Sequence, residues 1–224
     1  APADVALYFQ ALDERQMEVR RMRSMVSFKP GEVRGCTGCH ESRAGTAAPS
    51  HAPPLALKRT PHVPTPPPWG AERMLGYEWL VQPILDRHCT SCHGADEPDG
   101  GLDFTATRAS DGLYQSFRTM FGRIPGAEKP GPILVSCSDR FSDSGVSGPK
   151  QVGSHKSPLI RVLLDDELHE KEVELSPTEW LSLVTWVDTN APYHDAFLNK
   201  RPTSGDEPIR EVTFPASPVA LQTG

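Results

Sequence analysis

The stretch Cys89-Thr90-Ser91-Cys92-His93 has the pattern C-x-x-C-H. C-x-x-C-H is the attachment signature of c-type haem, in which two thiols bond covalently to the porphyrin and the histidine becomes an axial ligand of the iron. A second copy, Cys36-Thr37-Gly38-Cys39-His40, lies upstream, and the two copies use four of the five cysteines. The sequence therefore predicts two covalently bound c-type haems. The predicted attachment residues are Cys36, Cys39, His40, Cys89, Cys92 and His93.

The two motifs fit zinc, redox or disulfide sites less well than haem. A zinc ribbon needs its C-x-x-C pairs about fifteen to twenty residues apart, whereas 49 residues separate Cys39 from Cys89. A thioredoxin-like site requires a βαβ unit, which the sequence does not suggest. Disulfides within each pair would not require a histidine after both. Cys137 remains outside the motifs and is interpreted as a buried, inert thiol, with a reactive thiol as the alternative.

Composition limits the function classes. The chain has 224 residues, 23 prolines and 18 glycines, which predicts short regular elements and long loops. The fold class expected is mainly α with much irregular structure. A formal net charge of −6 argues against nucleic-acid binding. No apolar run approaches the roughly eighteen residues of a membrane-spanning helix.

Covalent haem attachment itself implies maturation outside the cytoplasm. The chain starts at Ala1 without an initiator methionine, as expected of a mature secreted product or of a piece of a larger polypeptide. We therefore expect an extracytoplasmic location, either the periplasm or an equivalent compartment.

The sequence pattern of residues 1–30 predicts a β-hairpin. Val5, Leu7 and Phe9 alternate with other residues at period two, and a second extended stretch begins at Met17 after a polar turn. An isolated hairpin is only marginally stable in water, so we expect a haem, a β-rich domain or subunit, or a redox partner protein to pack on it. The arginines of the hairpin are interpreted as a solvated face, or alternatively as partners of haem propionates. They are Arg15, Arg20, Arg21 and Arg23.

Three helices are predicted further along the chain. Apolar residues recur at helical spacing between Glu72 and Asp86, with a break or kink at Pro83. A short helix is expected within residues 113–121. Ser176-Pro177-Thr178-Glu179 forms a capping box that opens a helix closed by Asn190-Ala191-Pro192. The first and last of these should pack together as in a cytochrome c-like domain.

The domain organisation follows from these elements. Residues 1–48 form the hairpin and a loop-built first haem-binding segment, and residues 49–70 a proline-rich connector. Residues 71–200 form the cytochrome c-like second haem domain, and residues 201–224 an extended tail. His88, which adjoins the second motif, is interpreted as a surface or propionate-side residue.

The two motifs do not identify the sixth ligand of either iron. For the second haem the candidates are His155, His169 and His194, and His169 is preferred because it precedes Leu175-Ser176, where many bacterial c-type domains place a ligand methionine. Ligation by His93 and His169 would favour the ferric state and a low potential. For the first haem the sequence does not choose among several candidates, or no protein ligand at all. These are His51, His62, Met22, Met25 and Met74.

Several segments together resemble the C-terminal dihaem region of hydrazine synthase alpha subunits and their planctomycete relatives. They are Met22-Arg23-Ser24-Met25, Lys29-Pro30-Gly31-Glu32, the first haem motif, Pro67-Pro68-Trp69-Gly70, Val81-Gln82-Pro83-Ile84-Leu85-Asp86, Gly153-Ser154-His155-Lys156-Ser157 and Trp186-Val187-Asp188-x-Asn190-Ala191-Pro192-Tyr193. The resemblance spans about residues 5–198. It implies that a β-rich domain precedes the hairpin, and it gives the anammoxosome as an example of the expected extracytoplasmic compartment.

The resemblance also implies two functions. In hydrazine synthase the first haem is catalytic and the second, bis-histidine haem relays electrons. A tyrosine four residues after the motif histidine binds the catalytic iron, and the matching position here is Ala44. The preferred hypothesis is therefore a dihaem c-type cytochrome that transfers electrons within a larger complex. The alternative is a haem oxidoreductase whose open first haem acts on a small nitrogen or oxygen species.

Overall fold

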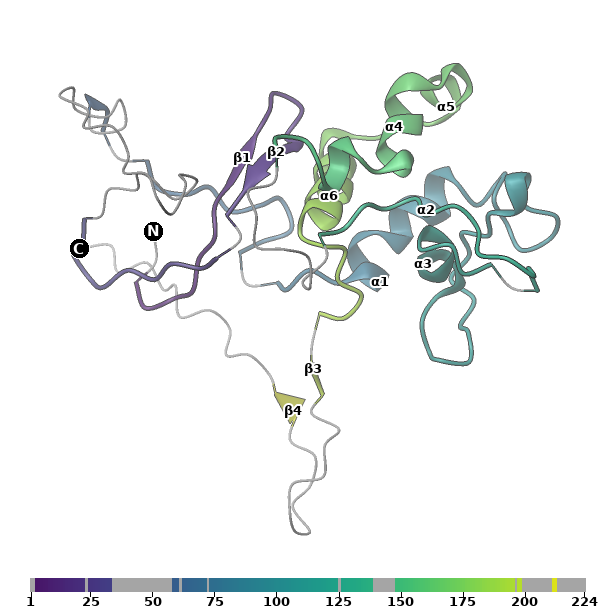
Figure 1. The fold of residues 1–224 in the computed structure, drawn as a ribbon, viewed down its shortest axis with the longest axis horizontal. Helices are drawn as coiled ribbons and strands as arrows, with labels where there is room; N and C mark the ends of the chain where they lie inside the picture. Colours follow the sequence, from purple (N-terminus) through teal and green to yellow (C-terminus); the bar gives the residue numbers. More distant parts are fainter. Residues whose placement is uncertain are drawn as a thin grey trace, which may run out of the picture.

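The structure is a computed structural model that describes residues 3–22, 24–33, 58–60, 62–71, 73–124, 126–138, 148–195, 197–198 and 211–212. Its α-helices are α1 (Tyr77–Leu80), α2 (Gln82–His88), α3 (Gln115–Met120), α4 (Pro158–Asp165), α5 (Glu167–Glu172) and α6 (Pro177–Asp188). Two 3-10 helices are η2 (Asp99–Gly101) and η3 (Gly153–His155), and the strands are β1 (Gln10–Leu12), β2 (Glu18–Arg21), β3 (Phe197–Leu198) and β4 (Glu211–Val212). Long irregular connections join the helices, which confirms a mostly helical fold with much irregular structure (Figure 1).

The helical break near Pro83 is present, although the helix begins at Tyr77 rather than at Glu72. Val81 separates α1 from α2, and Pro83 lies in the first turn of α2. Proline suits a first turn because its missing N–H has no helical partner there. It therefore starts the second helix rather than ending the first. The helix α2 leads straight into the second motif, and the Cys89 N–H bonds the Leu85 carbonyl at 2.8 Å.

The predicted capping box opens α6. The Ser176 hydroxyl accepts a hydrogen bond from the Glu179 N–H at 3.3 Å, and the Glu179 carboxylate accepts one from the Ser176 N–H at 2.9 Å. These bonds satisfy two donors that a helix start leaves unpaired. The short helix expected within residues 113–121 is also present, as α3.

The helices α4 and α5 were not predicted. Pro158 occupies the first turn of α4, and Asp166 caps α5 by accepting hydrogen bonds from the N–H groups of Leu168 and His169. Both helices are short, so neither repeats its apolar pattern often enough to stand out in sequence. The helix α5 carries His169, the preferred candidate for the sixth ligand of the second haem.

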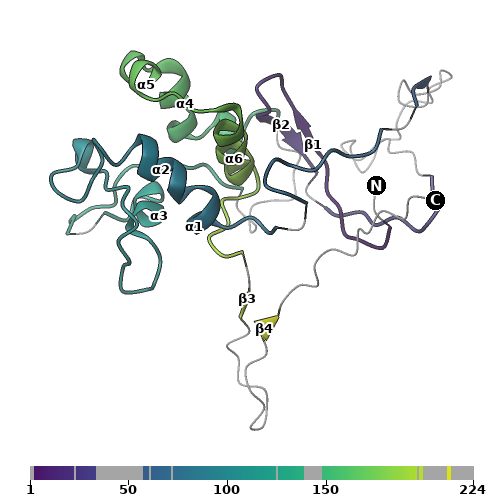
Figure 2. The same ribbon diagram turned by 180° about the vertical axis from the view of Figure 1, so that it is seen from behind.

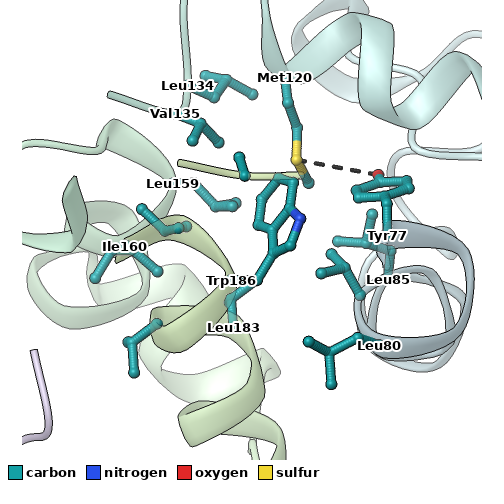
Figure 3. Packing of buried hydrophobic residues seen from close by; sticks show 14 of the residues in the cluster. Tyr77, Leu80, Leu85, Met120, Leu134, Val135, Leu159, Ile160, Leu183 and Trp186 are labelled. Atoms are coloured by element: carbon teal, nitrogen blue, oxygen red, sulfur yellow. Dashed lines mark hydrogen bonds between the residues drawn. The ribbon is translucent and has the colours of Figure 1, made fainter. Parts of the chain in front are cut away.

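The core is built around Trp186 of α6 (Figure 3). Its ring is fully buried and lies 5.3 Å from the Tyr77 ring, between centroids. The indole N–H donates to the Pro192 carbonyl at 2.9 Å. Leu85 of α2, Met120 of α3 and Ile160 of α4 belong to the same buried cluster. The last helix therefore joins the element that precedes the second motif to the rest of the body.

The N-terminal hairpin has the predicted form. Strands β1 and β2 pair antiparallel with Gln10 opposite Arg21, and a bridge between Leu7 and Val26 continues the ladder. The turn is closed by Asp13, whose carboxylate accepts a hydrogen bond from the Met17 N–H at 3.0 Å. Both ribbon views place the hairpin beside α6 (Figures 1 and 2).

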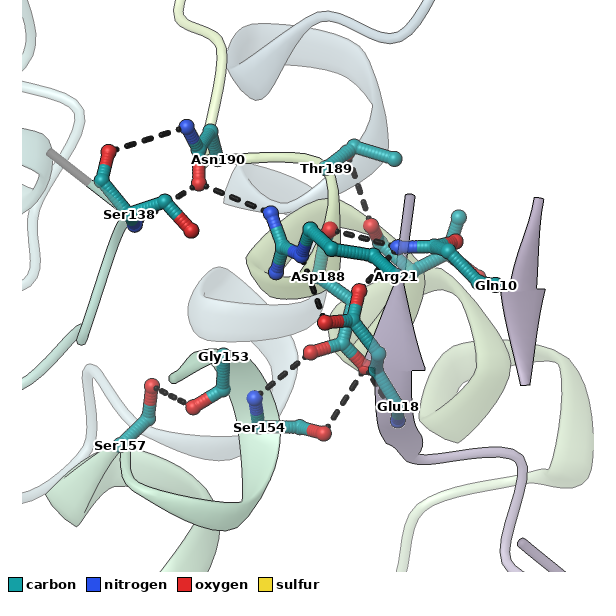
Figure 4. Close-up of polar contacts among 11 residues, drawn as sticks. Gln10, Glu18, Arg21, Ser138, Gly153, Ser154, Ser157, Asp188, Thr189 and Asn190 are labelled. Carbon is teal, nitrogen blue, oxygen red and sulfur yellow. Dashed lines mark hydrogen bonds and ion pairs between the residues drawn. The ribbon is translucent and has the colours of Figure 1, made fainter. Parts of the chain in front are cut away.

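Buried polar contacts join the hairpin to the helical body (Figure 4). The Asp188 carboxylate, 1% exposed, accepts hydrogen bonds from the Glu18 N–H at 2.9 Å, the Ser154 N–H at 2.7 Å and the Ser154 hydroxyl at 2.8 Å. Gln10 donates to the Asp188 carbonyl at 2.8 Å, and Arg21 pairs with Glu18 at 2.5 Å. We call Gln10, Glu18, Arg21, Ser154 and Asp188 the Asp188 network.

The Asp188 network corrects the interpretation of the hairpin arginines as one solvated face. Arg15 is exposed, but the Arg21 side chain is only 10% exposed and bonds both Glu18 and Asn190. Gly153 permits this close packing, because a Cβ there would lie 2.2 Å from an Asp188 oxygen and its φ is +71°. Burial raises the pKa of Glu18 and of Asp188, although hydrogen bonds to each act in the opposite direction.

A second ladder lies beyond the helical body. Phe197–Leu198 (β3) pairs antiparallel with Glu211–Val212 (β4), so the segment predicted as an extended tail contributes a strand (Figure 1). Among the described residues, none of the helices has the length and apolar character needed to cross a membrane.

Candidate functional site

The second C-x-x-C-H motif forms a compact turn at the end of α2. The His93 N–H bonds the Cys89 carbonyl at 2.9 Å, and the Cys92 N–H bonds the same carbonyl at 3.2 Å. Cys89 is half-buried, Cys92 is exposed, and both are free thiols. Burial raises the pKa of the Cys89 thiol to about 11. Two unlinked thiols on one turn are what covalent attachment of a porphyrin requires.

The His93 imidazole is held by the loop that follows it. Its Nδ1 lies 3.0 Å from the Asp99 carbonyl oxygen, and its ring centroid is 5.0 Å from that of Phe104. A carbonyl can only accept, so Nδ1 carries the proton and the lone pair of the neutral ring is on Nε2. Histidines that bind metals generally donate their other ring N–H to a carbonyl or carboxylate in this way.

The His169 imidazole is also held through Nδ1 by an oxygen of the protein. Its Nδ1 lies 2.8 Å from an Asp166 carboxylate oxygen. The hydrogen bonds from the side chain and backbone of His169 lower the pKa of Asp166, so this carboxylate is ionised and acts as the acceptor. With Nδ1 as the donor, the lone pair of a neutral His169 ring is therefore also on Nε2.

The fold brings the two imidazoles together. The ring centroids of His93 and His169 are 6.4 Å apart and their planes are within 16° of parallel. Two imidazoles that bind one metal ion from opposite sides, with bonds of about 2 Å, have ring centres about 6 Å apart. The separation of the two rings therefore matches that of two histidines bound to one iron.

The other histidines proposed as sixth ligands have different partners. His155 Nε2 lies 2.9 Å from an Asp13 carboxylate oxygen in the hairpin turn. His194 is exposed, with its ring 4.9 Å from that of Tyr193. Of the three candidates, His169 is the one whose ring pairs with that of His93.

The residues of the first motif lie outside the described residues. They are Cys36, Cys39 and His40, together with the candidate ligand His51. Among the remaining candidates Met22 is half-buried, whereas His62, Met25 and Met74 are exposed. Cys137 is a half-buried free thiol, and burial raises its pKa. The loop-built first site accordingly stays a prediction.

His88 differs from its interpretation as a surface residue. Its side chain is 15% exposed, and Nε2 lies 3.2 Å from a Glu179 carboxylate oxygen. The same carboxylate pairs with Arg87 and completes the capping box of α6. These contacts fasten the end of α2, just before Cys89, to the start of α6.

The Glu179 carboxylate makes stability depend on pH. Its burial would raise its pKa, but bonds from Ser176 and His88 outweigh this and lower the pKa from 4.5 to about 2. A carboxyl whose pKa is depressed by folding stabilises above its unfolded pKa and loses that contribution as pH falls through the folded value. We expect Glu179→Gln to reduce the loss of unfolding free energy between pH 4.5 and pH 2 by about 1–2 kcal/mol.

Urea unfolding at a series of pH values measures this difference. Glu174→Gln, at an exposed position outside the helices, is the matched control and should follow the wild type. Parallel losses in the Glu179→Gln variant and the wild type would contradict the assignment.

Comparisons with known proteins place this geometry in context. Residues 1–41 match the family model of the hydrazine synthase alpha subunit middle domain. This segment is related to the hydrazine synthase alpha subunit. The fold resembles a solved chain of Kuenenia stuttgartiensis hydrazine synthase with a TM-score of 0.50 and 18% identity, covering 94% of this chain and 32% of that one. No curated protein matches the sequence. The chain thus spans about a third of the hydrazine synthase chain that it resembles.

The resemblance drawn from sequence motifs is therefore supported as a relation to hydrazine synthase, and the hairpin lies within the segment that matches the middle domain. The sequence did not identify the acceptors of the two imidazoles. A signal for Asp166 was present, because aspartate directly before Glu167 is a typical helix N-cap. No sequence signal identifies the Asp99 carbonyl, because every residue has a backbone carbonyl group.

Proposed function

We propose that this chain is an extracytoplasmic dihaem c-type cytochrome that transfers electrons as a module or subunit of a larger complex. The observation that carries the proposal is the pairing of His93 with His169, each with Nδ1 engaged by a protein oxygen and Nε2 left for a metal. Cys89 and Cys92 would attach the haem covalently. A haem bound there would supply a one-electron ferric/ferrous couple.

The surrounding residues suit electron transfer. Donation from each Nδ1 makes the imidazole a stronger ligand, which stabilises the ferric state. Two histidine ligands also give a lower potential than a histidine with a methionine. With both axial positions filled by protein, the second haem would have no site for a substrate. The second haem is therefore proposed as an electron relay, and the first, at Cys36, Cys39 and His40, as its redox neighbour.

The hairpin is the proposed site of association with a β-rich domain, subunit or redox partner. The family model that matches residues 1–41 is that of a middle domain, which supports a neighbouring domain as the partner. Tyr8, Phe9 and Leu12 are large apolar side chains that remain between 43% and 48% exposed. Apolar side chains gathered on a short hairpin favour a covering partner.

A second candidate function is a haem oxidoreductase with an open first haem. The likeness of the fold to hydrazine synthase over 94% of the chain favours it. Alanine at position 44 argues against the synthase chemistry itself. The two candidates differ in whether the first iron has a free coordination position.

The test is the optical spectrum of the full chain, produced in a host that attaches c-type haem. We expect reduced c-type bands with two haems per chain and no change on adding carbon monoxide. Cys89→Ser combined with Cys92→Ser should remove half of the covalent haem. A spectrum without c-type bands would overturn the proposal, and carbon monoxide binding to half of the haem would favour the oxidoreductase.

A further inference from the structure

Gln82 lies at the start of α2 and is almost fully buried. Its side-chain amide N–H donates to the Phe104 carbonyl at 3.0 Å and to the Asp86 carboxylate at 2.7 Å. Its amide oxygen accepts from the Ser116 hydroxyl of α3 at 2.5 Å. One side chain thus joins α2, α3 and the loop that contains Phe104.

That loop is the one that holds His93. The Phe104 N–H bonds the His93 carbonyl at 2.9 Å, and the Phe104 ring packs on the imidazole. The Asp99 carbonyl, which accepts from His93 Nδ1, belongs to the same loop. Gln82 therefore fixes the Phe104 end of a segment that supplies both neighbours of the imidazole, without touching His93 itself.

We propose that Gln82 is a positioning residue for His93, and that it sets the reduction potential of the haem that His93 and His169 would bind. The inference rests on the proposed function of the His93–His169 pair. A firmly placed Asp99 carbonyl strengthens donation from Nδ1 and makes the imidazole more electron-rich, which stabilises ferric iron. A loosened loop weakens that donation and raises the potential.

Gln115 offers a matched control. It is a second buried glutamine, and its amide donates to the Thr119 hydroxyl at 3.1 Å and to the Arg123 carbonyl at 3.2 Å. Replacing it with methionine removes the same kind of group from the same core, while the Gln82–Phe104 bond stays in place. A general loss of stability should therefore be similar in both variants.

The experiment compares the haem-loaded full chain with Gln82→Met and Gln115→Met by spectroelectrochemistry and by electron paramagnetic resonance of the ferric state. We expect Gln82→Met to raise the midpoint potential of the lower-potential haem and to shift its low-spin g values, which depend on imidazole orientation. Gln115→Met should leave both unchanged. Gln82→Asn is measured beside them, because its shorter amide withdraws from Phe104 but keeps a polar group in the site, in case the methionine variant does not fold.

Equal shifts in the Gln82 and Gln115 variants, or no shift in either Gln82 variant, would overturn the positioning role. A wild-type chain without c-type haem would overturn the proposed function as well. The wild-type spectrum alone therefore separates the two failures.

Discussion

Replacing His169 with alanine is expected to make the proposed second haem reactive toward carbon monoxide. The ring of His169 lies 6.4 Å from that of His93, and its Nδ1 is held by Asp166. Without it the iron would keep His93 and gain an open position. Carbon monoxide bound at saturation should rise by about one molecule per chain, and the ferric spectrum of that haem should change from low-spin to high-spin.

The controls for this prediction are the two other histidines that were considered as the sixth ligand of the second haem. His155→Ala removes a partner of Asp13, and His194→Ala removes an exposed ring, so neither should alter carbon monoxide binding. Added imidazole should restore the low-spin spectrum of His169→Ala. An unchanged low-spin spectrum in His169→Ala would remove His169 as the ligand.

Replacing Asp188 with alanine is expected to destabilise the chain by about 3–5 kcal/mol. The Asp188 carboxylate accepts from the N–H of Glu18 and from both donors of Ser154, all in a buried setting. Its removal leaves those donors without an acceptor. Urea unfolding at constant haem content measures the loss, and hydrogen exchange should show the largest increase in the hairpin amides, because this network joins the hairpin to α6.

Asp165→Ala is the control for this prediction. Asp165 is an exposed carboxylate at the end of α4, and the 3.3 Å pair with Arg161 is a surface ion pair between residues one helical turn apart. Such pairs contribute little, so its loss should stay within about 0.5 kcal/mol. A similar small loss for Asp188→Ala would show that the hairpin is held by its apolar contacts instead.

Local patterns predicted the elements whose causes are local. The capping box at Ser176, the turn chemistry at Asp13 and the apolar spacing around Pro83 each act over a few residues, and the structure contains all three features. The helices α4 and α5 escaped prediction because each covers about two turns, too little for a periodic pattern to be distinctive.

The candidate site also has parts that the sequence predicts and parts that depend on the folded chain. The second C-x-x-C-H motif can be recognised from spacing alone, and His169 was preferred by its position before the last helix. The hydrogen bonds that orient the two imidazoles depend on the folded path of the chain through Asp99 and Asp166. The Asp188 network could not be predicted from local sequence patterns, because Glu18 and Asp188 are 170 residues apart.

This separation has a consequence for biosynthesis. A chain that crosses a membrane from its N-terminal end delivers Glu18 long before Asp188, so the hairpin cannot reach its buried acceptor until the sequence through α6 has followed. Contacts between such distant residues form late, because closing a long loop costs entropy before it gains any bond. Both C-x-x-C-H motifs lie between the two partners in the sequence. Under the proposed export and haem attachment, the enzymes that attach haem would therefore meet both motifs before Glu18 and Asp188 come together.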